Sequence, residues 1–144
     1  MNTPWRALLE VLDRSRPVLV QAHDFPDHDA IASAYALGQL LSRAGFDCAL
    51  TAGGRIQSIS LNAMMRELDI RLEPFEAARA DATRQTVLVD GSTASGTVKT
   101  VAGTLTGVID HHPARGRISC PFMDVRTDAG SCSAIVWSYW AEPA

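Results

Sequence analysis

The sequence predicts an α/β fold, a Rossmann-like three-layer domain with a mostly parallel sheet flanked by helices. Short apolar runs rich in β-branched residues alternate with longer segments in which apolar residues recur at helical spacing, and this alternation is typical of a parallel sheet. In addition, three of the apolar runs end in His or Asp, and ligands of parallel sheets bind at the carboxyl ends of strands. A chain of 144 residues can bury a core of its own, so we expect one domain.

In the first half of the chain, each predicted element has a local reason. Pro4 suits the first turn of a helix, where its missing N–H is not needed. The β-branched run after Pro17 is short enough for a buried strand, and Gly45 ends an amphipathic helix that begins near Ala30. In order, we expect a helix at 4–14, a strand at 17–22, a polar loop at 23–29, a helix at 30–44, a strand at 46–51, a loop at 53–54, a helix at 58–68 and a short strand at 70–72.

The second half continues the alternation, with strands that end in acidic residues. One apolar run ends at Asp90, and another ends at Asp110 and is followed directly by His111 and His112. Residues 92–103 between them have no strong period, and we expect a loop with a weak helix there. In order, we expect a helix at 74–80, a strand at 86–90, this irregular segment, a strand at 105–110, a strand at 118–125 and a helix at 131–140.

Charge and composition argue against several classes of function. The formal net charge is -3, which does not provide the basic surface that long DNA or RNA requires. Lys99 is the only lysine, so the Gly-Lys-Ser/Thr step of a P-loop is absent. The three cysteines lack metal-type spacing and are expected to be free thiols, and the apolar stretches are too short to span a bilayer. We therefore expect a cytoplasmic protein without a membrane partner.

All four histidines lie in two short polar stretches, each directly after a predicted strand. The first stretch, residues 23–29, contains His23, Asp27 and Asp29, and the second is residues 110–112. Each pattern alone has an ordinary structural explanation, because Pro and Asp are common in turns and helix caps and strands often end in Asp. Together they favour a functional site, since many carboxylates at one sheet edge repel each other unless a cation lies between them.

The ligand types indicate which cation and which chemistry. Carboxylates with imidazole suit Mn²⁺, with Mg²⁺, Zn²⁺ and Co²⁺ as alternatives, and the lack of cysteine argues against a structural zinc site. Two such ions can activate a water and hold phosphate oxygens, which suits displacement at phosphorus. The Gly-Gly-Arg run at residues 53–55 is either a phosphate contact or a plain surface turn.

These motifs resemble the DHH phosphoesterase superfamily, which includes single-strand exonucleases, nanoRNA hydrolases, cyclic-dinucleotide phosphodiesterases, exopolyphosphatases and family II inorganic pyrophosphatases. The resemblance extends over nearly the whole chain. The matching segments are His-Asp-Phe-Pro-Asp-His-Asp-Ala at 23–30, Val-Leu-Val-Asp at 87–90, Val-Ile-Asp-His-His-Pro at 108–113 and Ala-Gly-Ser-Cys-Ser-Ala at 129–134.

The resemblance implies a set of metal ligands that hold two divalent ions with one carboxylate between them. The ligands would be His23, Asp27 and Asp90 for one ion, and Asp29, Asp90 and His111 for the other. His112 would face the substrate phosphate. Asp110 would not bind an ion itself but would orient the metal-binding residues beside it.

The same resemblance predicts a Mn²⁺-dependent phosphoesterase that hydrolyses short oligonucleotides or nucleotides, and a non-catalytic DHH-fold domain with a binding or regulatory role is the alternative. Residues 1–144 would form the DHH domain alone, because the fourth metal-binding motif and the substrate-binding domain of the family normally lie further along. Ala32 stands where the family often has Gly.

We also expect self-association through apolar surface near Trp137, Tyr139 and Trp140, unless these aromatics complete the local core.

Overall fold

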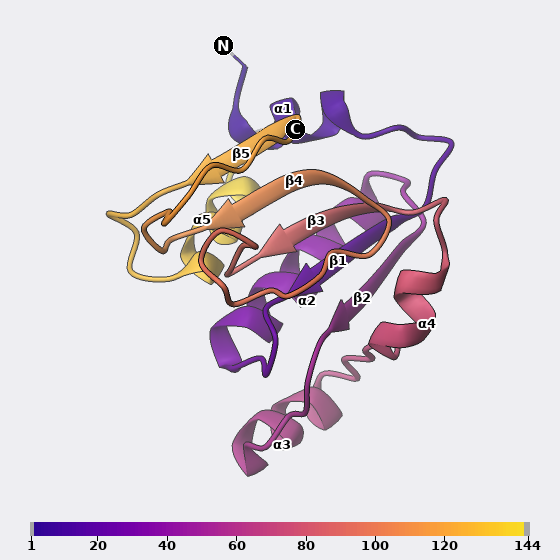
Figure 1. Ribbon diagram of the computed structural model, residues 1–144, viewed down its shortest axis with the longest axis vertical. Helices are drawn as coiled ribbons and strands as arrows, with labels where there is room; N and C mark the ends of the chain where they lie inside the picture. Colours follow the sequence, from indigo (N-terminus) through magenta and orange to yellow (C-terminus); the bar gives the residue numbers. More distant parts are fainter. Residues whose placement is uncertain (1, 143–144) are drawn as a thin grey trace.

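The fold is built on one parallel sheet, which the computed structural model describes together with its helices for residues 2–142. Within these residues, five strands lie in the spatial order β2-β1-β3-β4-β5 and all neighbours are parallel, which confirms the expected α/β class (Figure 1). The strands are β1 (Val18–Ala22), β2 (Cys48–Ala52), β3 (Gln85–Val89), β4 (Thr104–Asp110) and β5 (Phe122–Val125). The helices are α1 (Pro4–Val11), α2 (His28–Arg43), α3 (Ile59–Glu67), α4 (Phe75–Ala80) and α5 (Cys132–Trp140).

The central strands are covered on both faces, so alternate residues enter different cores. In β1, Val18 and Val20 pack in the core formed with α1, α2 and α5, whereas Leu19 packs with Ala78 of α4. Every residue of β1 and β3 is buried, as is usual for central strands of a parallel sheet. None of the helices in residues 2–142 is long and apolar enough to cross a membrane.

The predicted strand at 70–72 is wrong. In its place the structure has one isolated bridge between Thr51 of β2 and Glu73. The Glu73 N–H donates to the Leu50 carbonyl at 2.7 Å, and the Thr51 hydroxyl donates to the Glu73 carbonyl at 2.7 Å. The next residue is Pro74, which has no N–H to donate, so the pairing cannot extend into a strand.

The weak helix expected within residues 92–103 is also absent from this part of the structure. The Ser95 hydroxyl donates to the Ser92 carbonyl at 2.9 Å and lies 2.7 Å from the Thr97 hydroxyl. Such side-chain bonds give the backbone an alternative to helical pairing, and the segment forms turns. The strand predicted at 118–125 is similarly reduced to β5, which begins one residue after Pro121.

The three aromatic residues of the last helix differ in environment. Tyr139 is 1% exposed and its hydroxyl donates to Asp124 Oδ2 at 2.6 Å, so the expectation of apolar surface there is wrong for this residue. Trp140 is partly buried, and its Nε1–H donates to the Ala36 carbonyl at 3.1 Å. Trp137 is 69% exposed. Self-association through this end of the chain stays a prediction, and it now depends on Trp137.

A buried glutamine fixes the irregular connection between β3 and β4. Gln21 of β1 is fully buried, and its Nε2 donates to the Thr100 carbonyl at 2.8 Å while its Oε1 accepts from the Ala102 N–H at 3.2 Å. This side chain therefore replaces the backbone pairing that a regular element would have supplied to residues 100–102.

We expect Gln21→Leu to lower the free energy of unfolding by about 3 kcal/mol, because a leucine removes the partners of the Thr100 carbonyl and of the buried Ala102 N–H. Chemical denaturation measures this loss. The matched control is Gln57→Leu at an exposed position, for which we expect a change within about 0.5 kcal/mol. Equal effects of the two variants would contradict this role of Gln21.

Candidate metal centre

Three neighbouring strands end at one edge of the sheet, and each is followed by part of a polar cluster. Since β3 lies between β1 and β4, the residues after these strands are neighbours: His23 after β1, Asp90 after β3 and His111 after β4. The backbone at Asp90 has a φ of 57°, a left-handed conformation that Asp tolerates better than most residues. Its N–H donates to the Ile109 carbonyl at 3.0 Å, which ties the turn after β3 to β4.

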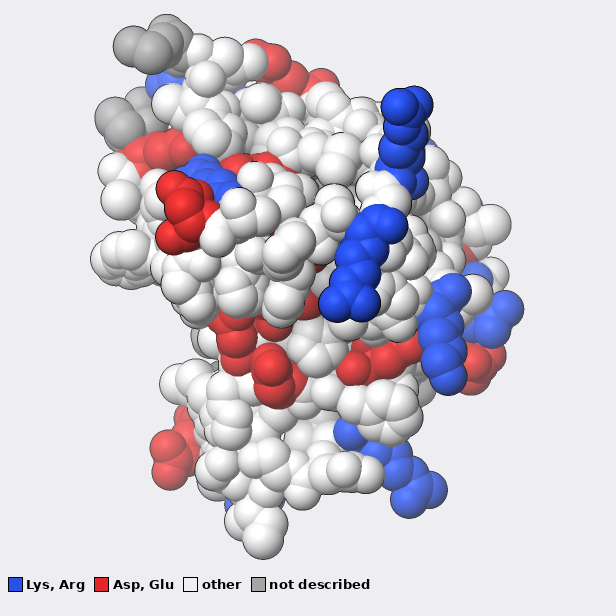
Figure 2. All heavy atoms as spheres, turned by 60° about the vertical axis from the view of Figure 1, so that its left-hand side comes forward, with Lys and Arg blue, Asp and Glu red and all other residues white. Residues whose placement is uncertain are grey.

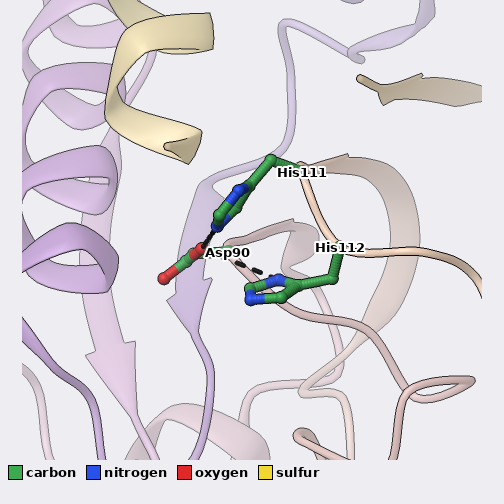
Figure 3. A group of neighbouring side chains, drawn as sticks. All are labelled: Asp90, His111 and His112. Carbon is green, nitrogen blue, oxygen red and sulfur yellow. Dashed lines mark ion pairs between the residues drawn. The ribbon is translucent and has the colours of Figure 1, made fainter. Parts of the chain in front are cut away.

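Asp90 occupies the centre of this cluster and is 2% exposed. His23 Nε2 lies 3.6 Å from Asp90 Oδ2, and His111 Nε2 lies 3.3 Å from Asp90 Oδ1. His112 Nδ1 lies 3.9 Å from Oδ1, and Figure 3 shows the rings of both His111 and His112 directed toward this carboxylate. A carboxylate with an imidazole beside each of its oxygens has the arrangement of a ligand shared between two cations.

His23 presents an electron pair to the cluster. Its Nδ1 lies 2.8 Å from the carbonyl oxygen of Asp24 and, because a carbonyl only accepts, this nitrogen carries the proton. In the neutral ring, Nε2 therefore directs its lone pair toward Asp27 Oδ1 at 3.7 Å and Asp90 Oδ2 at 3.6 Å. Three electron-rich atoms around one point, with no donor between them, suit a cation.

The first turn of α2 supplies two further carboxylates. Asp27 is the N-cap of α2, and its Oδ1 accepts from the Ala30 N–H at 2.9 Å. Because of this cap the helix begins at His28, two residues before the predicted start. Asp29 lies in the first turn, with its Oδ2 3.6 Å from His111 Nε2.

Asp29 is held by the start of α5, a contact that we did not predict from the sequence. The backbone N–H groups of Cys132 and Ser133 each donate to one of its oxygens at 2.9 Å. Burial acts to raise the pKa of Asp29, but these hydrogen bonds outweigh burial and hold the pKa below 3.8. The available signal was the run of small residues at 129–134, because a helix start without bulky side chains leaves its N–H groups open to an anion.

Within residues 2–142, two sets of three side chains have the spacing to hold an ion, with one donor atom from each residue within 4.8 Å of the others. The set of His23, Asp27 and Asp90 coincides with the ligands expected for the first ion. The second set joins Asp90, His111 and His112, so His112 stands where Asp29 was expected. Asp29 still lies beside His111, and its part in a second metal site remains a prediction.

Asp110 fixes the orientation of His112. Asp110 is 3% exposed, and its Oδ1 accepts from the N–H groups of His111 at 2.8 Å and His112 at 3.2 Å. The same oxygen accepts from His112 Nδ1 at 2.7 Å. With Nδ1 occupied, Nε2 of this half-exposed ring is the nitrogen left for a ligand.

Two other polar residues of the first motif lie outside the cluster. His28 is exposed, and its Nε2 lies 3.1 Å from the Ser60 hydroxyl. Asp24 Oδ2 accepts from the Lys99 N–H at 3.2 Å. The His and Asp residues of this stretch therefore have two roles. Some form the cluster, whereas His28 contacts Ser60 of α3 and Asp24 contacts Lys99 in the connection between β3 and β4.

The environment of Asp90 fits a divalent cation. Burial, and then the neighbouring carboxylates of Asp29 and Asp27, raise the pKa of Asp90 from 3.8 to about 8. Its Oδ1 is one of two buried side-chain polar atoms in residues 2–142 that have no hydrogen-bond partner. An unpaired buried polar atom costs roughly 1–3 kcal/mol, and a bound cation would remove that cost.

We expect Asp90→Asn to stabilise the metal-free protein at high pH. A carboxyl whose pKa is raised on folding holds its proton more tightly in the folded chain, so its contribution to stability is full below 3.8 and is lost as the pH rises through about 8. The gain should be about 1–2 kcal/mol in the free energy of unfolding at pH 8, and close to zero near pH 4. Denaturation of chelator-treated protein at both pH values measures it. A variant less stable than the wild type at pH 8 would contradict this account of Asp90.

Sequence comparisons place these residues in a known family. Residues 17–143 match the DHH family, N-terminal domain. The chain is also 33% identical over 130 residues to an uncharacterized protein of Methanocaldococcus jannaschii, a match that covers 90% of this chain and 27% of that protein.

The fold is similar to the crystal structure of an exopolyphosphatase-related protein from Bacteroides fragilis, with a TM-score of 0.59 at 14% identity. That similarity covers 88% of this chain and 39% of the other, so the chain spans well under half the length of both relatives. Because the family match covers most of its residues, this chain belongs to the DHH family, whose members generally hydrolyse phosphoesters with divalent metal ions.

Proposed function

We propose that this chain carries the metal-binding active site of an enzyme that hydrolyses phosphate esters or anhydrides, with nucleotides or short oligonucleotides as substrates. The observation that carries the proposal is the buried carboxylate of Asp90, which has an imidazole beside each oxygen and an Oδ1 without a hydrogen bond. A carboxylate buried for a structural purpose would be hydrogen-bonded. A carboxylate left without a partner, within reach of other metal-ligating groups, is what a cation site needs.

Two Mn²⁺ ions are the occupants that the donor atoms favour. His23, Asp27 and Asp90 would hold one ion. Asp29 and His111 would hold the other together with Asp90. Mixed imidazole and carboxylate donors suit Mn²⁺, and Mg²⁺, Co²⁺ and Zn²⁺ are alternatives. When bound, such a pair supplies an activated water and neutralises charge on the phosphate oxygens.

His112 is the residue that we assign to the substrate. Its Nδ1 is bonded to Asp110, so in the imidazolium form of the ring its Nε2 would donate a hydrogen bond to a phosphate oxygen while charge develops there. The hydrogen bonds from the backbone to Asp110 keep that carboxylate in place without any help from a metal ion. Asp110 is thus a positioning residue, and His112 is the group that contacts the substrate.

The charge distribution favours a small substrate. Figure 2, which brings the carboxyl ends of the strands forward, shows acidic side chains gathered in the hollow across the middle of this face and Lys and Arg as separate groups around it. Scattered cations and a net charge of -3 suit a short phosphorylated ligand rather than a long nucleic acid. Inorganic polyphosphate is the second candidate, since the B. fragilis neighbour is described as exopolyphosphatase-related.

We expect Mn²⁺ to raise the thermal stability of the chain, and Asp90→Ala to abolish that increase. An ion present at 100 times its dissociation constant adds about 2.7 kcal/mol to the free energy of unfolding, and a carboxylate shared by both sites contributes to each binding event. Calorimetric titration of metal-free protein gives the affinity. His28→Ala is the matched control, because this histidine lies in the same motif but outside the cluster, and it should retain binding. A folded wild-type chain that binds no Mn²⁺ would refute the metal assignment.

We expect His112→Gln to lower kcat for a Mn²⁺-dependent phosphodiester substrate by about 100-fold, since a neutral amide cannot replace an imidazolium donor aimed at the reacting phosphate. The dissociation constant for Mn²⁺ should change by no more than a few-fold. Loss of Mn²⁺ binding in this variant would instead make His112 a metal ligand, in line with its place in the second set of donors. A wild-type chain that binds Mn²⁺ but hydrolyses no phosphoester would favour the non-catalytic alternative.

A further inference from the structure

Phe25 is an aromatic residue in a place where folding alone does not require one. It lies in the first motif, two residues from both His23 and Asp27, and it is 59% exposed. Its φ is 52°, in the left-handed region that Gly, Asn and Asp adopt at much lower cost than a bulky residue. A residue that contributes little to the core and costs backbone strain is a candidate for a role in binding.

The ring of Phe25 rests on a glycine that leaves room for it. A Cβ atom built on Gly54 would lie only 2.7–2.9 Å from three atoms of the Phe25 ring. The Phe25 N–H also donates to the carbonyl of Gly53 at 2.9 Å, so the two loops are joined at this point. One side of the ring is therefore supported by the Gly-Gly turn after β2, and the exposure of the residue shows that the other side is open to solvent.

The ring borders a cavity of about 250 Å³ that is lined by a second aromatic residue, Phe75, by the Gly-Gly turn and by several polar side chains. Asp24 and Glu76 provide hydrogen-bond acceptors there, and Lys99 and Arg79 provide donors. Arg79 is paired with Glu76 at 3.6 Å, whereas Lys99 has no ion-pair partner within residues 2–142. The two carboxylates balance the two cations, so this lining has no excess positive charge to attract a phosphate. A nucleobase, in contrast, offers a flat face for stacking and an edge that carries both donors and acceptors.

We propose that Phe25 is the stacking platform for the nucleobase of a nucleotide whose phosphate lies at the metal cluster, with Asp24, Glu76 and Lys99 beside the edge of the base. This inference rests on the proposed function, because it takes the neighbouring motif residues to bind the phosphate. The cavity lies directly beside that motif, since Asp24 and Phe25 stand between His23 and Asp27 in the chain. Stacking on an aromatic ring tolerates any base, so the site should select nucleotides over base-free phosphates without strong base preference.

The test compares two ligands that differ only in the base, 5′-AMP and ribose 5-phosphate, by calorimetric titration of the full chain with Mn²⁺ present. We expect the wild type to bind 5′-AMP at least tenfold more tightly. In Phe25→Asn, the ratio of the two dissociation constants should fall toward one, because Asn accepts the left-handed backbone but offers no ring. Phe25→Trp should keep the preference or increase it. Trp137→Ala, which removes an exposed aromatic ring on α5, is the matched control and should leave the ratio unaltered.

Each outcome decides the inference. A wild-type ratio near one, or an unchanged ratio in Phe25→Asn, would overturn it. If Phe25→Asn does not fold, the wild-type ratio and the response of Phe25→Trp still decide, and a Trp variant without preference for 5′-AMP would contradict stacking. A chain that hydrolyses tripolyphosphate but has no preference for 5′-AMP would contradict the stacking platform alone. A chain that prefers 5′-AMP but hydrolyses nothing would contradict the proposed hydrolase alone.

Discussion

A carboxylate buried without a hydrogen-bond partner on one of its oxygens is the constraint on which the rest of this structure depends. Asp90 follows the middle strand of the sheet, so neighbouring strands separate it from solvent on both sides. Folding must bury this carboxyl with Asp27 and Asp29 close by, and burial together with these neighbours raises its pKa to about 8. The free energy for this comes from elsewhere, chiefly from the apolar residues of β1 and β3 that are buried on both faces of the sheet.

The acidic residues around Asp90 are held by backbone N–H groups, and this arrangement keeps the cluster in order. Asp27 accepts from the start of α2, Asp29 from the start of α5, and Asp110 from the turn after β4. Each hydrogen bond fixes the position of its carboxylate independently of the others. The donors that a cation would meet are thus already arranged, which reduces the reorganisation that binding requires.

The sequence predicted the α/β fold and the meeting of the polar residues at one edge of the sheet, because both depend on strong local patterns. Strands that end in His23, Asp90 and Asp110 must bring those residues to one edge once the sheet is parallel. The errors arose where tertiary contacts decide. A hydroxyl network replaced the weak helix near Ser95, and the pairing of Glu73 with Thr51 stopped at a proline.

Contacts between distant segments were beyond sequence reasoning for the same reason. The hydrogen bonds from Cys132 and Ser133 to Asp29 join residues more than one hundred positions apart, and no local period encodes them. Tyr139 was expected either at an apolar surface or in the local core, and the structure buries its ring while its hydroxyl donates to Asp124. A helix that is apolar on every side indicates burial but does not specify which residue is buried.

Backbone strain is concentrated near the proposed site, which bears on how the site is built. In residues 2–142 the non-glycine residues with positive φ are Phe25, Asp69 and Asp90, and two of these three belong to the motifs. The left-handed turn at Phe25 lets the chain reverse between His23 and Asp27, so that both reach Asp90 from a loop rather than from one helix face. Glycine or asparagine would make that turn at lower cost. The turn therefore explains the backbone at position 25 but not the aromatic ring, and the ring requires a separate reason in the space that it faces.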